Sequence, residues 1–186
     1  MNTIKSLFAQ KSWSNNELFN ALAAVPVAKH MESVHTAVRT LNHIYTVDKI
    51  FQAHLLGEPH VYKATNTDAT PELDELQFMV AETDSWYETY VSGLLKDNPL
   101  DKLGDSLNDS VSFVFTDGDT GTMSREEILL HVITHGAYHR GNVGQVLKSI
   151  SIAPPRDLYT RFLHTHEPAR RQARGRELGS ASLAAN

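Results

Sequence analysis

Residues 124–150 read SREEILLHVITHGAYHRGNVGQVLKSI, and this stretch decides the class of fold. Ser124 and Glu127 have the spacing of a capping box, which predicts a helix from 125 to about 150. At 100° per residue, one set of side chains stays within roughly 80° of arc and forms the core-facing stripe of this helix. The stripe consists of Ile128, Val132, His135, His139, Val143, Val146 and Ile150. Two histidines therefore lie in the buried seam of a long amphipathic helix.

Two long helices are expected near the start of the chain. Ser14 and Glu17 repeat the capping-box spacing, which predicts a first helix from there to about residue 26. Apolar residues recur at helical spacing from 31 to 56, and Gly57 then supplies a left-handed stop, so a second helix is predicted over that range.

The third long helix and a short hairpin are expected before residue 124. Thr70 followed by a proline predicts the start of a helix that continues to about residue 96. The β-branched and aromatic run 111–115, followed by turn-forming residues, predicts a short β-hairpin. The fold class is therefore all-α: a four-helix bundle with a hairpin between the third and fourth long helices. Asp157 is expected to cap a last short helix that ends near residue 163.

Length and composition exclude several classes of protein. The 186 residues, 41% of them hydrophobic, indicate one domain, placed at 1–165, and the arginine-rich remainder, 166–186, is expected to be a disordered tail. The chain has no cysteine, which excludes disulfides, thiolate metal sites and a cysteine nucleophile. The net charge of −5 argues against a nucleic-acid partner. Without a long apolar run or a signal-peptide pattern, the expected location is the cytoplasm, with no membrane partner.

The histidine pair on the fourth helix has the spacing of metal ligands. His135 and His139, at i and i+4, share one face of the helix and can bind one ion. His131 extends the series, but it lies about 12 Å from His139 along the helix, too far for one ion to bind both. His131 also lies further from the centre of the stripe, so we choose His135 and His139. The alternative is that both are core histidines hydrogen-bonded to neighbouring helices.

A third ligand is expected from a neighbouring helix. The second helix offers His35, His43 and His54. His43 stands in the middle of an apolar run, which favours an inward orientation, but periodicity does not single it out. His54 lies at nearly the same angle about 16 Å further along, so His43 and His54 cannot serve one ion.

Two segments resemble a known family. Residues 41–55, LNHIYTVDKIFQAHL, and residues 131–144, HVITHGAYHRGNVG, are similar to the DinB (YfiT-like) family of metalloenzymes. The resemblance extends over about residues 1–165. It implies a four-helix bundle with a crossed connection, and it implies homodimers.

The resemblance also implies a divalent ion held by three histidines, which in this sequence are His43, His135 and His139. Members of the family include transferases that depend on low-molecular-weight thiols and an isomerase that uses a thiol cofactor. The resemblance therefore selects His43 on the second helix but implies no single reaction.

An ion with three histidine ligands keeps coordination positions for water or substrate. We therefore expect a metal-dependent enzyme that acts on a small molecule by thiol transfer or hydrolysis, with zinc or nickel, although iron and copper also suit imidazole ligands. Because the chain has no cysteine, a thiol would have to be a diffusible cofactor. The alternative function is a non-catalytic protein that binds or senses a metal or ligand, with a structural ion.

Four residues near the predicted ligands are weaker candidates for the site. Asp48 is expected either to support a ligand or act as a base, or to be a helix-surface partner of a lysine or arginine. Tyr138, Arg140 and Asn42 flank the ligands and could contact substrate, or could serve in packing.

Overall fold

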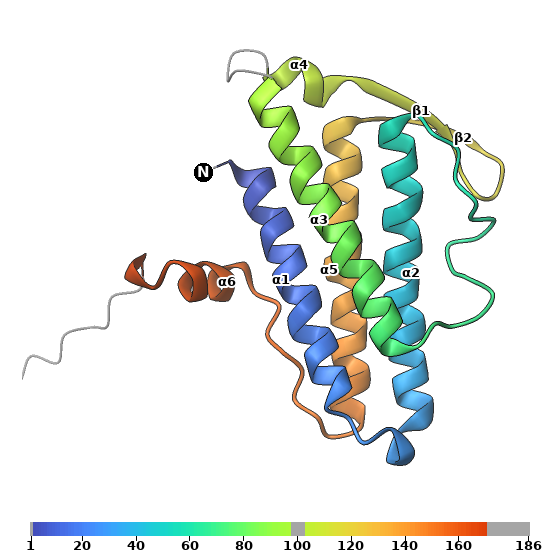
Figure 1. The fold of residues 1–186 in the computed structure, drawn as a ribbon, viewed down its shortest axis with the longest axis vertical. Coiled ribbons are helices and arrows are strands. Elements are labelled where there is room, and N and C mark those ends of the chain that lie inside the picture. The colour runs from blue at the N-terminus through green and yellow to red at the C-terminus, as the bar shows by residue number, and fades with distance from the viewer. Residues whose placement is uncertain (1, 98–102, 171–186) are drawn as a thin grey trace, which may run out of the picture.

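The computed structural model describes residues 2–97 and 103–170 and has the predicted all-α class (Figure 1). The four long helices are α1 (Thr3–Ala23), α2 (Met31–Leu56), α3 (Leu73–Asp97) and α5 (Arg125–Ser149). The short elements are η1 (Val27–Lys29), α4 (Leu103–Asn108), β1 (Ser110–Val114), β2 (Thr120–Ser124), α6 (Tyr159–His166) and η2 (Pro168–Arg170). The strands pair antiparallel, with Phe113 opposite Gly121, so the predicted hairpin is confirmed.

The bundle has the crossed connection that the resemblance implied. Both α1 and α2 pack against α3 and α5, so α1 and α2, consecutive in the sequence, lie diagonally across the bundle. Helices α2 and α3 run in the same direction (Figure 1), and residues 57–72 therefore return along the length of the bundle to join them. This return brings a loop beside α2.

Two helix ends were predicted correctly. Ser124 caps α5: its hydroxyl accepts the Glu127 N–H at 3.1 Å, and the Glu127 carboxylate accepts the Ser124 N–H at 2.7 Å. Helix α2 ends at Gly57, whose φ of 68° is the left-handed conformation that glycine adopts without strain. The helix that carries the histidine pair is thus fixed at its N-terminus by local sequence alone.

The predicted start of the first helix is wrong. Helix α1 begins at Thr3, where the side chain of Asn2 accepts the N–H groups of Ile4 and Lys5. The extra turns bury Ile4 and Phe8 in the core, and this burial stabilises a helix that starts before Ser14. The hydroxyl of Ser14 donates to Asp157 at 2.7 Å instead of capping a helix.

Two other boundaries also differ from the predictions. Thr70 does not cap α3, which starts at Leu73, because its hydroxyl faces His35 (3.3 Å) and Arg39 (3.5 Å) on α2. Asp157 does not cap α6, because its carboxylate pairs with Arg140 at 2.7 Å.

The start of the predicted tail is helical. Helix α6 continues to His166, and η2 covers residues 168–170. The rest of the predicted disordered tail, 171–186, lies outside the described residues.

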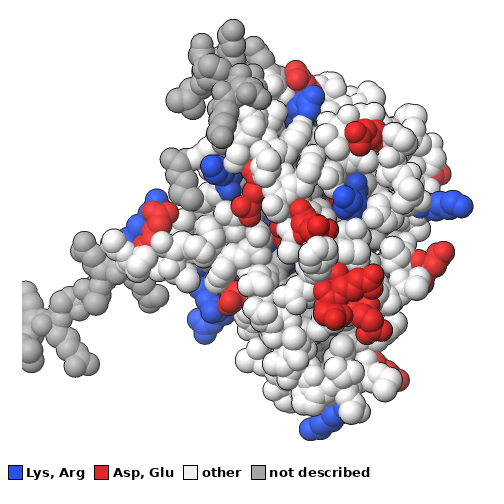
Figure 2. Space-filling view, viewed as in Figure 1, with Lys and Arg blue, Asp and Glu red and all other residues white. Residues whose placement is uncertain are grey.

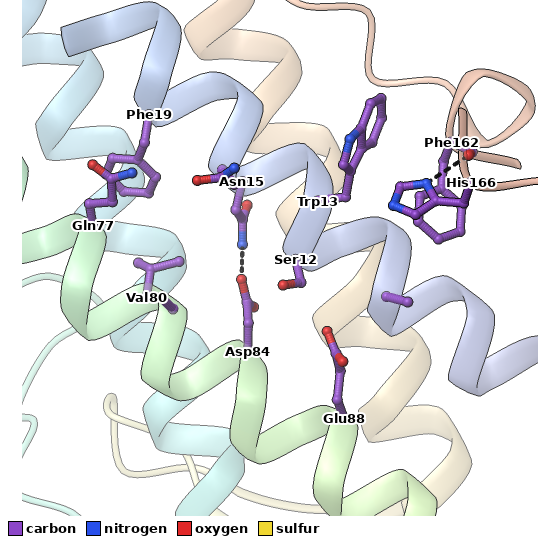
Figure 3. A pocket seen from close by; sticks show the side chains of 13 residues that line it. Ser12, Trp13, Asn15, Phe19, Gln77, Val80, Asp84, Glu88, Phe162 and His166 are labelled. Carbon is purple, nitrogen blue, oxygen red and sulfur yellow. Dashed lines mark hydrogen bonds between the residues drawn. The ribbon is translucent and has the colours of Figure 1, made fainter. Parts of the chain in front are cut away.

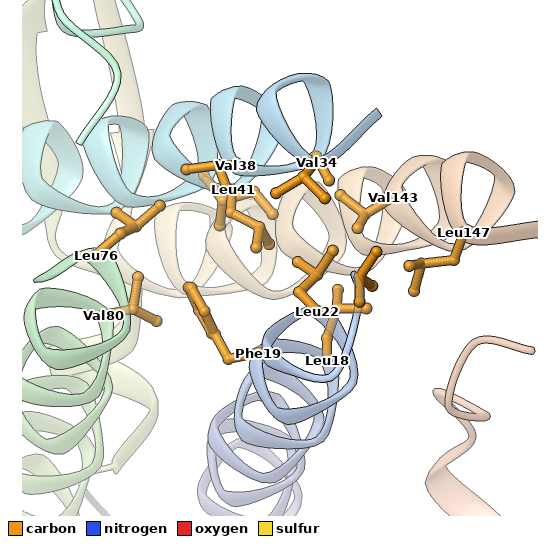
Figure 4. Packing of buried hydrophobic residues seen from close by; sticks show 13 residues of the cluster. Leu18, Phe19, Leu22, Val34, Val38, Leu41, Leu76, Val80, Val143 and Leu147 are labelled. Carbon is orange, nitrogen blue, oxygen red and sulfur yellow. The ribbon is translucent and has the colours of Figure 1, made fainter. Parts of the chain in front are cut away.

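The apolar core is divided into two clusters along the bundle. One cluster joins the end of α1 to the start of α2 and the end of α5 (Figure 4), and it includes Leu18, Leu22, Val38, Leu41, Val143 and Leu147. The other lies nearer the hairpin and includes Phe8, Val47, Phe51, Tyr87, Phe113, Ile128 and Val132. Between the two clusters the helices bury polar side chains, among them Lys11, Thr46, Asp84 and Arg140, and His135 and His139 lie at the same level of α5.

On the face seen in Figure 2, basic side chains are scattered, and the largest group of one sign is acidic. Within the described residues, no helix combines the length and the apolar character needed to cross a membrane.

Candidate metal centre

The three histidines predicted as ligands lie together. His43 comes from α2, and His135 and His139 come from α5, which packs against it. The ring centroid of His43 lies 4.9 Å from that of His135 and 4.6 Å from that of His139, and the centroids of His135 and His139 are 4.5 Å apart. One nitrogen from each imidazole lies within 4.8 Å of the others, and all three side chains are half-buried. The three imidazole nitrogens therefore converge on one point, and the group is accessible to solvent.

A backbone carbonyl fixes the tautomer of His43. Its Nδ1 lies 2.6 Å from the carbonyl oxygen of Thr65, which can only accept a hydrogen bond. Nδ1 of neutral His43 therefore carries the proton, and the lone pair is on Nε2. That atom lies 3.0 Å from Nε2 of His135. Metal-bound histidines in proteins commonly have this support from a carbonyl.

His135 stays neutral at physiological pH. Burial, and then the nearby His139 and His43, lower the pKa of His135 to about 3. Burial and His43 also lower the pKa of His139. A neutral imidazole has the lone pair that a metal ion needs, so the low pKa favours ligation over protonation.

The donor set fits a divalent transition-metal ion. Two nitrogens each about 2.1 Å from an ion, at a right angle, would lie about 3 Å apart, close to the Nε2 separation of His43 and His135. Three imidazoles suit zinc, nickel, copper or iron. Nδ1 of His135 is buried and has no partner among the described residues.

The histidines that helix geometry excluded lie outside this group. His131 stacks on His135 with centroids 5.3 Å apart and also contacts Phe51. His54 stacks on Phe113 at 4.5 Å. Among the described residues, the three-residue group suited to an ion does not include either of them.

A buried ion network lies beside the centre. Lys11 of α1 is fully buried, and its Nζ lies 2.8 Å from Asp48 of α2 and 2.5 Å from Asp84 of α3. Nδ2 of Asn15 donates to Oδ2 of Asp84 at 2.7 Å, and the side-chain Oδ1 of Asn15 accepts from Nη1 of Arg140 at 3.2 Å. The network therefore connects all four long helices at the level of the histidines.

The network decides how Asp48 is placed. Asp48 does pair with a lysine, as one of the two alternatives expected, but it is only 2% exposed, so that alternative is wrong in placing the pair on the helix surface. Burial raises the pKa of Asp48 to about 6, although Lys11 opposes this. For Lys11, burial alone would lower the pKa, but the charges of Asp48 and Asp84 raise it.

Sequence reasoning missed Lys11, although a signal was present. On α1 the buried positions Ile4, Phe8, Leu18 and Leu22 follow helical spacing, and Lys11 falls in the same stripe. A lysine in a core-facing stripe requires a buried carboxylate partner.

Arg140 is buried rather than directed toward substrate. It is 3% exposed, its Nε donates to Asp157, and a Cβ added at Gly136 would lie 3.1 Å from its Nη1. Tyr138 is 68% exposed, and its ring packs edge-on against His139 with centroids 4.9 Å apart. Of the flanking residues, Tyr138 is thus placed to meet a molecule that approaches from solvent.

A cavity of about 490 Å³ lies on the opposite face of the bundle (Figure 3). Its walls come from α1, α3 and α6 and include Trp13, Phe19, Asp84 and Phe162. The three histidines come from α2 and α5, so this cavity is separate from the candidate centre.

Comparison with known proteins identifies the family. Residues 1–173 match the sequence profile of the DinB family. The chain belongs to the DinB family. It is 26% identical over 160 residues to Protein DinB of Bacillus subtilis (strain 168), which covers 79% of this chain and 86% of that protein. No solved structure matches the chain with statistical significance. Membership of the DinB family and the three-histidine group are together compatible with metal binding.

Proposed function

We propose that this DinB-family chain is a metal-dependent enzyme that acts on a small molecule by thiol transfer or hydrolysis. The observation that carries the proposal is the half-buried group of His43, His135 and His139, whose nitrogens converge while one side stays open to solvent. A divalent ion there would lower the pKa of a water or thiol that occupies its open positions.

The chain's own residues would position the ion and the substrate. His43, His135 and His139 would hold the ion, with Thr65 orienting His43. Tyr138 would contact substrate, because its exposed ring borders His139. Asp48, enclosed by the network with Lys11, would keep α1 and α2 in register rather than act as a base.

Metal titration tests the binding step. The protein, stripped with a chelator, is titrated with zinc and with nickel by calorimetry, and the bound metal is quantified by elemental analysis. We expect one ion per chain, and we expect His135→Ala to abolish binding. The matched control is His164→Ala on α6, which should bind as the unsubstituted protein does. Wild-type binding by the His135 variant would show that the ligands are wrong.

Two assays separate the reactions. Conjugation of 1-chloro-2,4-dinitrobenzene in the presence of glutathione tests thiol transfer, because the chain has no cysteine and the thiol must be added. Release of nitrophenol from p-nitrophenyl acetate tests hydrolysis. Activity should require the ion in either case, and Tyr138→Ala should raise KM without changing metal affinity. An equal rate with stripped protein would contradict the proposal, and stoichiometric metal without any turnover would favour the sensing or structural alternative.

The proposal includes a homodimer located in the cytoplasm. The dimer is supported by the family resemblance, and light scattering of the purified chain tests it.

A further inference from the structure

The loop that returns along the bundle is fastened to α2 next to His43. We name residues 65–70 the strap. Arg39, one turn before His43, donates from Nη1 to the carbonyl of Thr67 at 2.6 Å. The crossed connection is the reason this segment lies here, because residues 57–72 must run back past the middle of α2 to reach α3.

Asn42 is the buried anchor of the strap. Its side chain is fully buried, and Nδ2 donates both to Oδ1 of Asn66 and to Oγ1 of Thr67, the latter at 2.7 Å. Asn66 in turn donates from Nδ2 to the carbonyl of Arg39 at 3.2 Å. The amide group of Asn42 therefore fixes the strap at a side chain, and Asn66 fixes it again at the backbone of α2.

Stability alone does not account for an asparagine at this position. Oδ1 of Asn42 is buried and has no partner in the part of the chain that the structure describes. Burial of an oxygen without a partner destabilises a fold, and this cost offsets much of what the two donated bonds contribute. What asparagine provides at this position is the Nδ2 group, which donates to Asn66 and Thr67 of the strap.

The anchored residue is next to the one that supports His43. Asn42 holds Asn66, and the neighbouring Thr65 accepts the Nδ1–H of His43. Two successive residues of α2 thus bind two successive residues of the strap. A shift of the strap would withdraw the Thr65 carbonyl and free both the rotation and the tautomer of the His43 ring.

We infer that Asn42 is a positioning residue for the metal centre: through Asn66 it holds the Thr65 carbonyl that keeps Nε2 of His43 unprotonated and directed at the other two histidines. The effect on metal affinity rests on the proposed function, whereas the effect on the His43 tautomer does not.

The experiment compares Asn42→Ala and Asn66→Ala with Asn20→Ala, the same substitution at an exposed site on α1. Zinc affinity is measured against a competing chelator. We expect Asn42→Ala and Asn66→Ala, which we call the strap variants because each removes a contact between α2 and the strap, to bind zinc about 10- to 100-fold more weakly, as for other outer partners of metal ligands. On the metal-free proteins, long-range ¹H–¹⁵N spectra report the His43 tautomer. The unsubstituted chain and Asn20→Ala should show the Nδ1–H form, and the strap variants should show a mixture.

The outcomes distinguish this inference from the proposed function. If the unsubstituted chain binds no zinc, the proposed function fails, and the tautomer measurement still decides the role of the strap. If Asn42→Ala does not fold, the partly exposed Asn66 carries the test. Unchanged affinity in the folded strap variants would overturn the inference, and so would weaker binding with an unchanged His43 tautomer.

Discussion

Lys11 offers the sharpest test of how the bundle is held together. It is a fully buried cation between two buried carboxylates, Asp48 at 2.8 Å and Asp84 at 2.5 Å. Substitution Lys11→Met keeps the length of the side chain but leaves both carboxylates without their cation. Removal of one partner of a buried ion pair typically destabilises a protein by about 3–5 kcal/mol, and we expect a loss in this range near neutral pH.

The loss should depend on pH in a defined direction. Burial already raises the pKa of Asp48 to about 6, although the charge of Lys11 lowers it. Removal of that charge should therefore raise the pKa of Asp48 further. Between the unfolded pKa near 3.8 and the raised folded value, the folded variant binds more protons than the unfolded chain. Both proteins therefore gain stability as the pH falls below about 6, but only the variant also gains stability between its own, higher Asp48 pKa and about 6. The loss relative to the unsubstituted protein is therefore smaller at about pH 5 than at about pH 7.5.

Urea unfolding of metal-free protein, followed by circular dichroism, measures the difference at both pH values. Lys5→Met on the exposed face of α1 is the matched control and should change stability by less than about 0.5 kcal/mol. The triple variant Lys11→Met, Asp48→Asn, Asp84→Asn removes all three charges and should recover most of the loss. A loss below about 1 kcal/mol, or an equal loss at both pH values, would refute the reasoning.

Three smaller changes test the helix ends and the C-terminal segment. Ser124→Ala should lower the free energy of unfolding by about 1 kcal/mol through loss of the capping box, whereas Ser149→Ala at the other end of α5 should have little effect in the same urea experiment. Gly57→Ala should destabilise the protein by about 1 kcal/mol, because the φ of Gly57 is 68°. Gly93→Ala within α3 should stabilise it by a similar amount, because an added Cβ meets nothing within 4 Å. Equal effects at the two sites would contradict this. Asp157→Ala removes the partner of Arg140 and should speed amide hydrogen exchange in α6 while exchange in α2 stays unchanged.

Local signals were sufficient where they agreed with the core. The capping box at Ser124 and the stop at Gly57 lie where apolar periodicity also begins or ends, and both helix ends were predicted correctly. At Ser14 the same capping pattern was misleading, because Ile4 and Phe8 bury apolar surface that only an earlier helix start provides. Tertiary packing overrode the local preference there.

The candidate site shows the same limit. The spacing of His135 and His139 predicted that they share a face, and the structure brings His43 to them from the neighbouring helix α2. No spacing within one segment can predict that Asn42 binds Asn66, 24 residues away in the sequence. Nor can it predict that Asp157 pairs with Arg140 instead of capping α6. The Asn42 contact depends on the crossed connection, which only the family resemblance implied, and the Asp157 contact depends on how the segment after α5 turns back toward Arg140.

The approach of His43 Nε2 to within 3.0 Å of His135 Nε2 links α2 to α5 across their interface. An ion held there would bind the folded chain but not the separated helices, and would raise the free energy of unfolding by about 4 kcal/mol when its free concentration exceeds Kd a thousandfold. In a cell starved of that ion, a larger unfolded fraction would be exposed to proteases, so the abundance of the chain would follow the metal supply. If the half-life of the protein in cells does not change when a chelator is added, this link between metal supply and protein turnover is wrong.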